Sequence, residues 1–417
     1  MATQEPAGAD TWMRRALALA ERGRGSTSPN PMVGAVLVRD GEVVGEGFHR
    51  APGEPHAEAL ALAAAGALAA GATCYVTLEP CAHHGRTPPC ADALVAAGVG
   101  RVVAAVQDPD PRVRGSGFAR LRAAGVEVEV GVGAAEAEAQ NAAFVLHRRL
   151  GRPRVTLKAA ASLDGKVAAP DGTSQWITGA AARADAHRLR AEADAVVVGA
   201  GTALADDPRL TVRLPSWTGR QPLRVLVDSA GRVGARGQLF DASAPTLVAT
   251  TAAALPAATG AWAAAGAEVL VCAEAPGAPG GVDLADLVKA LGARDVLELL
   301  VEGGPRLHAA FWAAGLADRL VWYLAPLVIG GDAAPGLLPG AGAPTLANAR
   351  GLRIESVDRL GDDLRVVAYP ERSAEGEQQG GRVLGARRRG PGNPKGRRGP
   401  GNAEGRRGPG NPKGVPR

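Results

Sequence analysis

The chain has few aromatic residues and few cysteines, and it has no long apolar run. Phe, Trp and Tyr make up 3% of the 417 residues, too few to line a groove with stacking platforms for nucleic-acid bases. Four cysteines cannot build the disulfide framework of a secreted scaffold, so a cytoplasmic location is predicted. No stretch of about 18 apolar residues occurs, so we expect no membrane span. The N-terminus also lacks the basic-then-apolar order of a signal peptide.

The overall charge of +5 is unevenly distributed. Residues 372–417 contain twelve Lys and Arg and three Glu, which gives this segment +9 and leaves −4 for the rest of the chain. The sequence pI of about 9.3 therefore reflects the C-terminal segment. The remaining body has no overall attraction for nucleic acid, because such attraction needs a net positive field.

The C-terminal segment is repetitive. Three copies of Arg-Arg-Gly-Pro-Gly-Asn-x-x-Gly occupy residues 388–396, 397–405 and 406–414. Glycine and proline at this density cannot bury a core, so a disordered tail is predicted over 371–417. Two roles stay open for it. The arginine pairs could bind polyanions weakly, since arginine binds phosphate regardless of sequence, or the tail could be a solubilising extension.

One stretch combines residues that are typical of a metal centre. It contains His56-Ala57-Glu58, then Pro80-Cys81 and finally Cys90. One imidazole and two thiolates form a zinc ligand set that leaves a coordination position open for water. Zinc lowers the pKa of such a water, so that hydroxide is available near neutral pH. His-x-Glu followed by Pro-Cys and a second Cys is the signature of zinc deaminases, in which the glutamate moves protons.

Two features of this stretch leave alternatives open. The usual signature has two residues between its cysteines, whereas eight separate Cys81 from Cys90. His83 and His84 are rival ligands, and either could complete the four-ligand set of a non-catalytic zinc module. A zinc-dependent nucleoside or nucleic-acid base deaminase with an appended non-catalytic domain would share the same metal residues. The few aromatics and the acidic body argue against nucleic acid as its substrate.

Hydrophobic patterning predicts an α/β sandwich for the first part of the chain. The residues Asp40-Gly41 predict a tight hairpin between strands 33–38 and 42–48. The helices that follow His56 and begin at Cys90 have their positive ends at the metal residues, where they favour thiolate and hydroxide. Further strands are expected at 73–78, 101–106 and 126–130, and helices at 12–22, 57–70, 90–97 and 118–124.

A second domain is predicted from about residue 154. Its last expected strand leads into Glu302-Gly303-Gly304-Pro305 and a helix over 307–314. Such a turn can bind phosphate through backbone N–H groups, but it is also a common way to end a strand. The segment Ala200-Gly201-Thr202 is expected to be a loop. Strands are expected at 154–160, 196–199, 223–227, 246–249, 269–271 and 296–301, and a helix at 180–192. No Gly-x-Gly-x-x-Gly opens a βαβ unit, so a Rossmann site is not supported.

Motifs in both parts of the chain resemble the bifunctional riboflavin-biosynthesis deaminase/reductase family. In the first part they are His56-Ala57-Glu58, the Pro80–Cys90 loop, Ser28-Pro29-Asn30-Pro31 with Val33-Gly34, and Asp108-Pro109-Asp110-Pro111. In the second part they are Ser162-Leu163-Asp164-Gly165-Lys166, Trp176-Ile177-Thr178, Gly201-Thr202 with Ala205-Asp206-Asp207-Pro208, Leu210-Thr211-Val212-Arg213 and Glu302-Gly303-Gly304. The resemblance spans about residues 10–370, with Asp110 standing where asparagine is expected.

The resemblance implies a fold and two reactions. Residues 1–150 would form a cytidine-deaminase-like α/β/α zinc domain, and residues 151–370 a dihydrofolate-reductase-like α/β domain. The first would deaminate 2,5-diamino-6-ribosylamino-4(3H)-pyrimidinone 5′-phosphate by hydrolysis. The second would use NADPH to reduce the ribosyl group of the product to ribityl. The expected partners are thus a small pyrimidine phosphate and further copies of the chain in a homo-oligomer, with no membrane.

The resemblance also implies roles for individual residues. Zn²⁺ would be bound by His56, Cys81 and Cys90, with Glu58 as the general acid and base, and Asn30 and His49 would contact the deaminase substrate. NADPH would contact Ala160, Trp176, Thr202, Asp206, Ser229 and Gly304. The reductase substrate would contact Ser174, Arg190, Leu210, Arg213 and Glu302. Arg190 and Arg213 suit its phosphate, because a guanidinium binds phosphate bidentately; surface ion pairing is the alternative for both.

Overall fold

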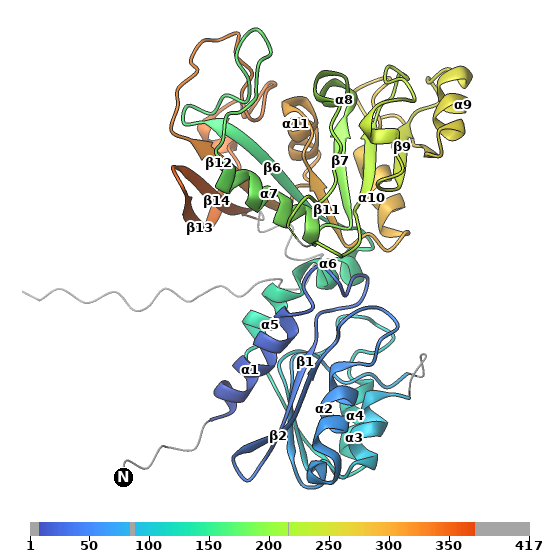
Figure 1. Cartoon of the computed structure of the whole chain (residues 1–417), viewed down its shortest axis with the longest axis vertical. Coiled ribbons are helices and arrows are strands. Elements are labelled where there is room, and N and C mark those ends of the chain that lie inside the picture. The colour runs from blue at the N-terminus through green and yellow to red at the C-terminus, as the bar shows by residue number, and fades with distance from the viewer. Residues whose placement is uncertain (1–7, 84–87, 216, 372–417) are drawn as a thin grey trace, which may run out of the picture. The chain divides into compact units, whose positions relative to one another are not determined.

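The computed structural model describes residues 8–83, 88–215 and 217–371. The predicted disordered tail beyond Glu371 lies outside these residues. Two β-sheets, each covered by helices, account for the described chain (Figure 1). The predicted fold class is therefore confirmed. In the described ranges no helix is both long and apolar enough to cross a membrane.

The first sheet has five strands in the order β2-β1-β3-β4-β5. Strand β1 is antiparallel to β2 and β3, whereas β3, β4 and β5 are parallel. Asp40 and Gly41 have φ of 51° and 81°, the conformation of a tight hairpin turn, which confirms the hairpin prediction. The strands are β1 Gly34–Arg39, β2 Glu42–Phe48, β3 Thr73–Val76, β4 Arg101–Ala104 and β5 Glu127–Val130.

Helices cover both faces of this sheet. Successive residues of a strand point to opposite faces, and in β1 the residues that point to either face are apolar. In β1, Ala35 and Leu37 pack in the cluster that contains α2, α3 and α4, whereas Val36 and Val38 pack with α1 and α5. The helices are α1 Ala9–Glu21, α2 Ala57–Ala65, α3 Cys90–Ala96, α4 Ser116–Ala123, α5 Ala134–Gln140 and α6 Ala142–Leu150. The last two were not expected from the sequence.

Glycines in the first two strands let helices approach the sheet closely. A Cβ on Gly34 would clash with the Ala16 carbonyl oxygen of α1, and a Cβ on Gly47 would lie 2.6 Å from the Ala57 carbonyl oxygen of α2. Helix α2 is shorter than the predicted 57–70. It ends at Gly66, whose φ of 53° breaks the helical path, and a 3₁₀ turn over Gly66–Ala69 follows.

The second sheet has nine strands in the order β10-β9-β8-β7-β11-β6-β12-β14-β13. The strands from β10 to β12 are parallel, and β14 and β13 add an antiparallel hairpin at one edge. The strands are β6 Arg154–Ser162, β7 Ala195–Gly199, β8 Leu223–Val227, β9 Thr246–Thr250, β10 Glu268–Val271, β11 Glu298–Val301, β12 Arg319–Ala325, β13 Leu352–Leu360 and β14 Asp363–Pro370. Strands β12, β13 and β14 were not predicted.

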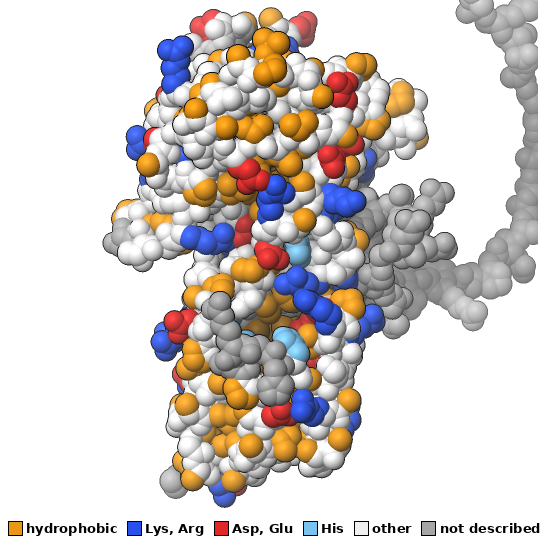
Figure 2. Space-filling model, turned by 90° about the vertical axis from the view of Figure 1, so that its right-hand side faces the viewer, with side chains coloured by type: hydrophobic (Ala, Val, Ile, Leu, Met, Phe, Trp, Pro, Cys, Tyr) orange, Lys and Arg blue, Asp and Glu red, His pale blue; other side chains and the backbone are white. Residues whose placement is uncertain are grey.

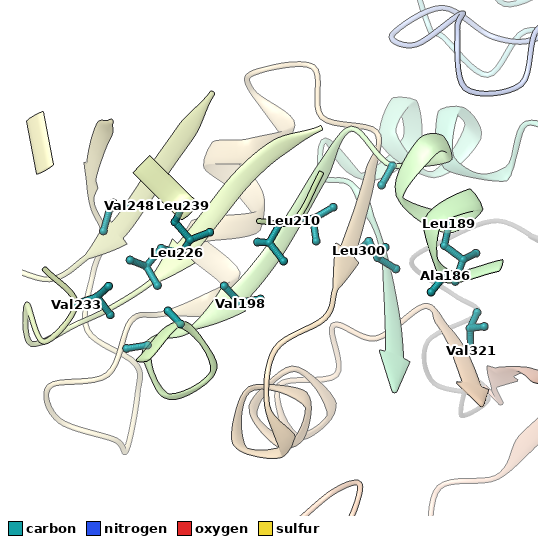
Figure 3. Close-up of a cluster of buried hydrophobic side chains, with 14 of the residues drawn as sticks. Ala186, Leu189, Val198, Leu210, Leu226, Val233, Leu239, Val248, Leu300 and Val321 are labelled. Atoms are coloured by element: carbon teal, nitrogen blue, oxygen red, sulfur yellow. The ribbon is translucent and has the colours of Figure 1, made fainter. Parts of the chain in front are cut away.

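Both faces of this sheet are also apolar. Val198, Leu226 and Leu300 point to the face covered by α7 and α9 (Figure 3), whereas the opposite face packs against α10 and α11. The helices are α7 Ala180–Glu192, α8 Ala200–Asp206, α9 Pro256–Ala264, α10 Leu284–Gly292 and α11 Pro305–Ala313. The prediction of a loop at residues 200–202 is wrong, because these residues form the first turn of α8. Helices α9 and α10 were not predicted.

The close contact at Gly34 yields a test of the packing between α1 and β1. We expect Gly34→Ala to destabilise the protein by about 1–3 kcal/mol, because the added methyl group must push α1 away from the sheet. Gly260→Ala is the matched control: its methyl group meets no atom within 4 Å in α9, so it should stabilise by about 0.5–1 kcal/mol through helix propensity. Scanning calorimetry measures both. Equal melting temperatures for Gly34→Ala and the wild type would contradict the proposed contact.

Candidate active sites

Three predicted metal ligands come together at one end of the first sheet. His56 is the N-cap of α2, Cys81 follows β3, and Cys90 is the first residue of α3. His56 Nδ1 lies 3.3 Å from Cys90 Sγ and 3.7 Å from Cys81 Sγ, and the three ligand atoms lie within 4.8 Å of one another. Tetrahedral zinc, with bonds of about 2.0–2.3 Å, places its ligand atoms roughly 3.5–3.8 Å apart. The group therefore fits zinc.

The surroundings of Cys81 favour its thiolate, the form that binds metal. The Cys90 thiol lies within 4.8 Å of Cys81 Sγ, and the backbone N–H of Cys90 donates to Cys81 Sγ at 3.3 Å. These contacts, together with His56, lower the pKa of Cys81 despite its partial burial. The N–H belongs to the first turn of α3, so the positive end of that helix faces the sulfur, as predicted.

Glu58 lies in the first turn of α2 and is only 4% exposed. Burial raises its pKa to about 7, against the opposing effect of the His56 charge. A carboxyl group with a pKa near neutrality can take and release protons at the working pH of most enzymes. The chemistry of Glu58 therefore suits proton transfer beside the metal group.

Asn30 and His49 also lie beside the metal ligands. Their side chains are 3.0 Å apart, between Nδ2 and Nε2, and the His49 ring packs edge-on to His56 with centroids 5.5 Å apart. Burial lowers the pKa of His49, which favours the neutral imidazole. The structure thus brings both predicted substrate contacts to the same site.

The rival histidines differ from these residues. His83 is exposed, and His84 lies outside the described residues. Among the residues that the structure describes, His56, Cys81 and Cys90 form the one group of three or more metal-binding side chains. The described residues therefore supply three ligands, the number typical of a catalytic zinc with an open position.

A cavity of about 1610 Å³ lies in the second domain. It is bounded by the carboxyl ends of β7, β8 and β11. The chain continues from β7 toward one edge of the sheet and from β11 toward the other edge, so a topological switch point lies between these two strands. Open parallel sheets bind ligands at such switch points. All eleven residues predicted to contact NADPH or the reductase substrate line this cavity: Ala160, Ser174, Trp176, Arg190, Thr202, Asp206, Leu210, Arg213, Ser229, Glu302 and Gly304.

A buried charge cluster forms part of the cavity wall. Glu302 pairs with Arg190, whose Nη2 lies 2.9 Å from Glu302 Oε2, and with Lys158, whose Nζ lies 3.3 Å from the same oxygen. Burial would raise the pKa of Glu302, but the two positive charges outweigh it and hold this pKa below its usual range. Sequence reasoning missed Lys158. A lysine in the middle of the largely buried strand β6 was the available signal.

Arg213 differs from Arg190 in its partners. The Arg190 guanidinium is occupied by Glu302, whereas no carboxylate in the described ranges lies within 4.0 Å of the Arg213 guanidinium. The backbone N–H of Arg213 donates to His187 Nδ1 at 3.2 Å. Burial and the charges of Arg190 and Arg213 lower the pKa of His187 to about 4, so that its imidazole is neutral. Arg213 is therefore a cation in the cavity that is available to an anionic ligand.

Two glycines also line the cavity, where β11 leads into α11. A Cβ on Gly304 would lie 2.9 Å from Thr202 Oγ1, and a Cβ on Gly303 would lie 2.6 Å from Leu307 Cδ2. Gly304 is the N-cap of α11. The backbone can thus approach a ligand at the positive end of a helix, which suits a phosphate group. Trp176 is 70% exposed at the cavity, with the Arg183 guanidinium 4.7 Å from its ring centroid.

Family models match both halves of the chain. The "Cytidine and deoxycytidylate deaminase zinc-binding region" matches residues 7–106, and the "RibD C-terminal domain" matches residues 153–366. With the geometry of the two sites, these matches define a zinc-binding deaminase domain joined to a reductase domain.

Known proteins resemble the whole arrangement. The riboflavin biosynthesis protein RibD of Escherichia coli K12 is 45% identical over 364 residues, covering 85% of this chain and 97% of that protein. A solved structure of Acinetobacter baumannii RibD, form 1, has a TM-score of 0.79 at 39% identity, covering 87% of this chain and 99% of that one. A Thermotoga maritima diaminohydroxyphosphoribosylaminopyrimidine deaminase/5-amino-6-(5-phosphoribosylamino)uracil reductase has a TM-score of 0.76 at 34% identity, with coverage of 87% and 98%. The chain belongs to the RibD family of riboflavin biosynthesis proteins.

The metal group can be tested by measuring zinc in the purified protein. We expect about one zinc per chain in the wild type and a large loss of zinc in Cys81→Ser, because an alcohol is a far weaker zinc ligand than a thiolate. Cys272→Ala is the control, since Cys272 is a buried thiol of the second domain outside the metal group. Elemental analysis after dialysis gives the answer. Full zinc content in Cys81→Ser would exclude this residue as a ligand.

Proposed function

We propose that this chain carries out two consecutive steps of riboflavin biosynthesis. The first domain deaminates the diamino-ribosylamino-pyrimidinone 5′-phosphate, and the second reduces the ribosyl group of the product with NADPH. The supporting observation is that a RibD-family chain combines the His56–Cys81–Cys90 group and the adjacent Glu58 with a second cavity lined by every predicted reductase residue. The first site has the metal ligands and proton carrier that hydrolytic deamination requires, and the second has the cavity and phosphate-binding groups that reduction by NADPH requires.

In the first site, His56, Cys81 and Cys90 would hold zinc. Zinc, when bound, lowers the pKa of a water molecule and so supplies hydroxide near neutral pH. Glu58 would take one proton of that water and deliver it to the ring nitrogen. It would then carry the second proton, from the hydroxyl group newly bonded to the ring carbon, to the departing amine, which leaves as ammonia. Its raised pKa allows both directions of transfer. Asn30 and His49 would orient the pyrimidine by hydrogen bonding.

In the second site, the switch-point cavity would hold NADPH and the deaminated intermediate together. NADPH, when bound, supplies the hydride. Its phosphates suit the glycine turn before α11, where Thr202 leaves no room for a side chain at Gly304. The remaining proposed cofactor contacts are Ala160, Trp176, Asp206 and Ser229, which line the same cavity. Ser174 and Leu210 would lie against the substrate.

The two predicted phosphate-binding arginines receive different roles. Arg190 is committed to the buried pair with Glu302, so its guanidinium would act mainly by keeping this carboxylate ionised and oriented. We assign the substrate phosphate to Arg213. Burial lowers the pKa of Arg213, and the nearby positive charges of Arg190 and Arg209 lower it further. A dianionic phosphate would balance that excess charge.

A nucleic-acid base deaminase remains the weaker candidate. On the face drawn in Figure 2, the described residues show acidic and basic side chains interspersed with apolar ones. The expected homo-oligomer concerns contacts beyond a single chain, and the expected polyanion binding concerns the tail outside the described residues. Both remain predictions.

A single substitution can separate the two half-reactions. We expect Glu58→Gln to keep zinc but to lower deamination at least 100-fold, because proton transfer of this kind contributes about 10²–10⁴-fold to a rate. The same variant should oxidise NADPH at the wild-type rate when it receives the already deaminated intermediate. Ammonia release and absorbance of NADPH are the two measurements. Retained deamination would remove Glu58 as the proton carrier, and loss of both activities would indicate misfolding.

Arg213→Ala tests the phosphate assignment. We expect KM for the deaminated substrate to rise about 10- to 100-fold, because a hydrogen bond to a charged group contributes about 1.5–3 kcal/mol. Deamination should be unchanged. Arg188→Ala is the matched control, because Arg188 lies on α7 with a 65% exposed side chain and pairs with Asp185. A KM equal to that of the control variant would move the phosphate to another residue.

A further inference from the structure

The spacing of the two cysteines creates a structural requirement. A Cys-x-x-Cys turn fixes both thiols by its own short geometry, but eight residues separate Cys81 from Cys90. The entropy lost on closing a loop grows with its length, so this longer spacing does not by itself hold the two thiols together. The two ends therefore need contacts from elsewhere in the fold if the thiols are to stay at a zinc-binding separation.

One arginine of α4 contacts both ends of this segment. Arg120 Nη1 donates to the carbonyl oxygen of Ala82 at 3.0 Å. Its Nε lies 2.5 Å from Asp92 Oδ1. Ala82 directly follows Cys81, and Asp92 lies in the first turn of α3, two residues after Cys90. A single guanidinium thus connects the chain just after the first thiol to the helix that begins with the second.

A buried carboxylate ties the start of α4 to the same segment. Glu79 is 3% exposed and precedes Cys81 by two residues. Its oxygens accept backbone N–H groups of Gly115 and Gly117 at 2.9 Å each, and those of Phe118 at 3.3 Å and Asp108 at 3.1 Å. These donors include the N-cap and first turn of α4. A Cβ on Gly117 would clash with the Pro80 carbonyl oxygen, so the helix start packs directly against this segment.

We propose that α4 is a clamp that sets the distance between Cys81 and Cys90, with Glu79 and Arg120 as its positioning residues. Glu79 holds α4 against the chain before Cys81, and Arg120 then fixes the chain after Cys81 relative to α3. An isolated surface ion pair would contribute little. Arg120 differs because its two acceptors belong to the two separate segments that carry the thiols. The proposal rests on the zinc site proposed above.

The test compares two arginines of the same helix. Arg120→Ala should bind zinc about 10-fold more weakly than the wild type, the lower end of the effect typical of residues that orient metal ligands. Arg122→Ala removes the same charge from α4. Arg122 contacts the Val128 carbonyl oxygen of β5, at 3.5 Å, and the Phe118 ring, at 5.8 Å from its centroid, and neither belongs to a segment that carries a thiol. This variant should bind zinc like the wild type. Zinc affinity is measured by competition with a chelator whose zinc affinity is known.

Further measurements distinguish positioning from general stability. Arg120→Lys should give an intermediate zinc affinity, because lysine keeps the charge but lacks the planar fork that reaches two acceptors. Arg120→Ala should also lower kcat of deamination more than it raises KM, since Asn30 and His49 remain in place. NADPH oxidation with the deaminated intermediate should be unchanged. Glu79→Gln, which places an amide NH₂ against backbone donors, should lose zinc as well.

The outcomes separate the clamp from the zinc site itself. Wild-type zinc affinity in both Arg120→Ala and Arg122→Ala would overturn the clamp while leaving the zinc site intact. An equally reduced zinc affinity in both variants would also overturn it, because the loss of helix charge alone would then explain the effect. A wild-type protein that binds no zinc would remove the zinc site and the clamp together. A loss confined to Arg120→Ala, partly restored by Arg120→Lys, is the expected result.

Discussion

The deaminase half depends on one geometric constraint: an imidazole and two thiols must lie within bonding distance of the same ion. His56, Cys81 and Cys90 come from three separate segments, so no local turn can impose this distance. The sheet does so through the close approach of its helices. Gly47 lets α2 sit directly on β2, and α2 presents His56 at its N-terminus. The site therefore depends on backbone packing at positions that carry no chemistry themselves.

The reductase half depends on a different constraint, the balance of buried charge. Glu302 is almost inaccessible, and an unpaired carboxylate there would be costly. Arg190 compensates it from α7 and Lys158 from β6, so the three charges join these two elements to the end of β11. Glu302 is paired with Arg190, and the charges of Arg190 and Arg209 lie near Arg213. The same balance thus explains why one predicted phosphate ligand is occupied and the other is available.

Much of the architecture could be predicted from local patterns. Strand β8 and helix α7 agree with the prediction at both ends, because Gly, Pro and charged residues mark their limits. Strands β12, β13 and β14 were missed. Residues of β13 are largely exposed, so it shows no buried face that a hydrophobic pattern could reveal. Helix α8 was missed because its glycine and threonine are typical of loops, and its stability comes from packing Ala200 and Ala203 into the core.

The chemistry of this protein could be predicted from residue identities, because zinc, proton-transfer and phosphate chemistry each require particular side chains in a particular order. His56, Glu58, Cys81 and Cys90 were predicted on that basis, and the reductase residues through their motifs. Which of these side chains are paired and which are available depends on the packing of the whole fold. Three contacts join residues that are far apart in the chain. Arg190 pairs with Glu302, Lys158 lies beside this pair, and Arg120 contacts both segments that carry the cysteines. Such contacts depend on how the sheets and helices pack, which no local pattern encodes.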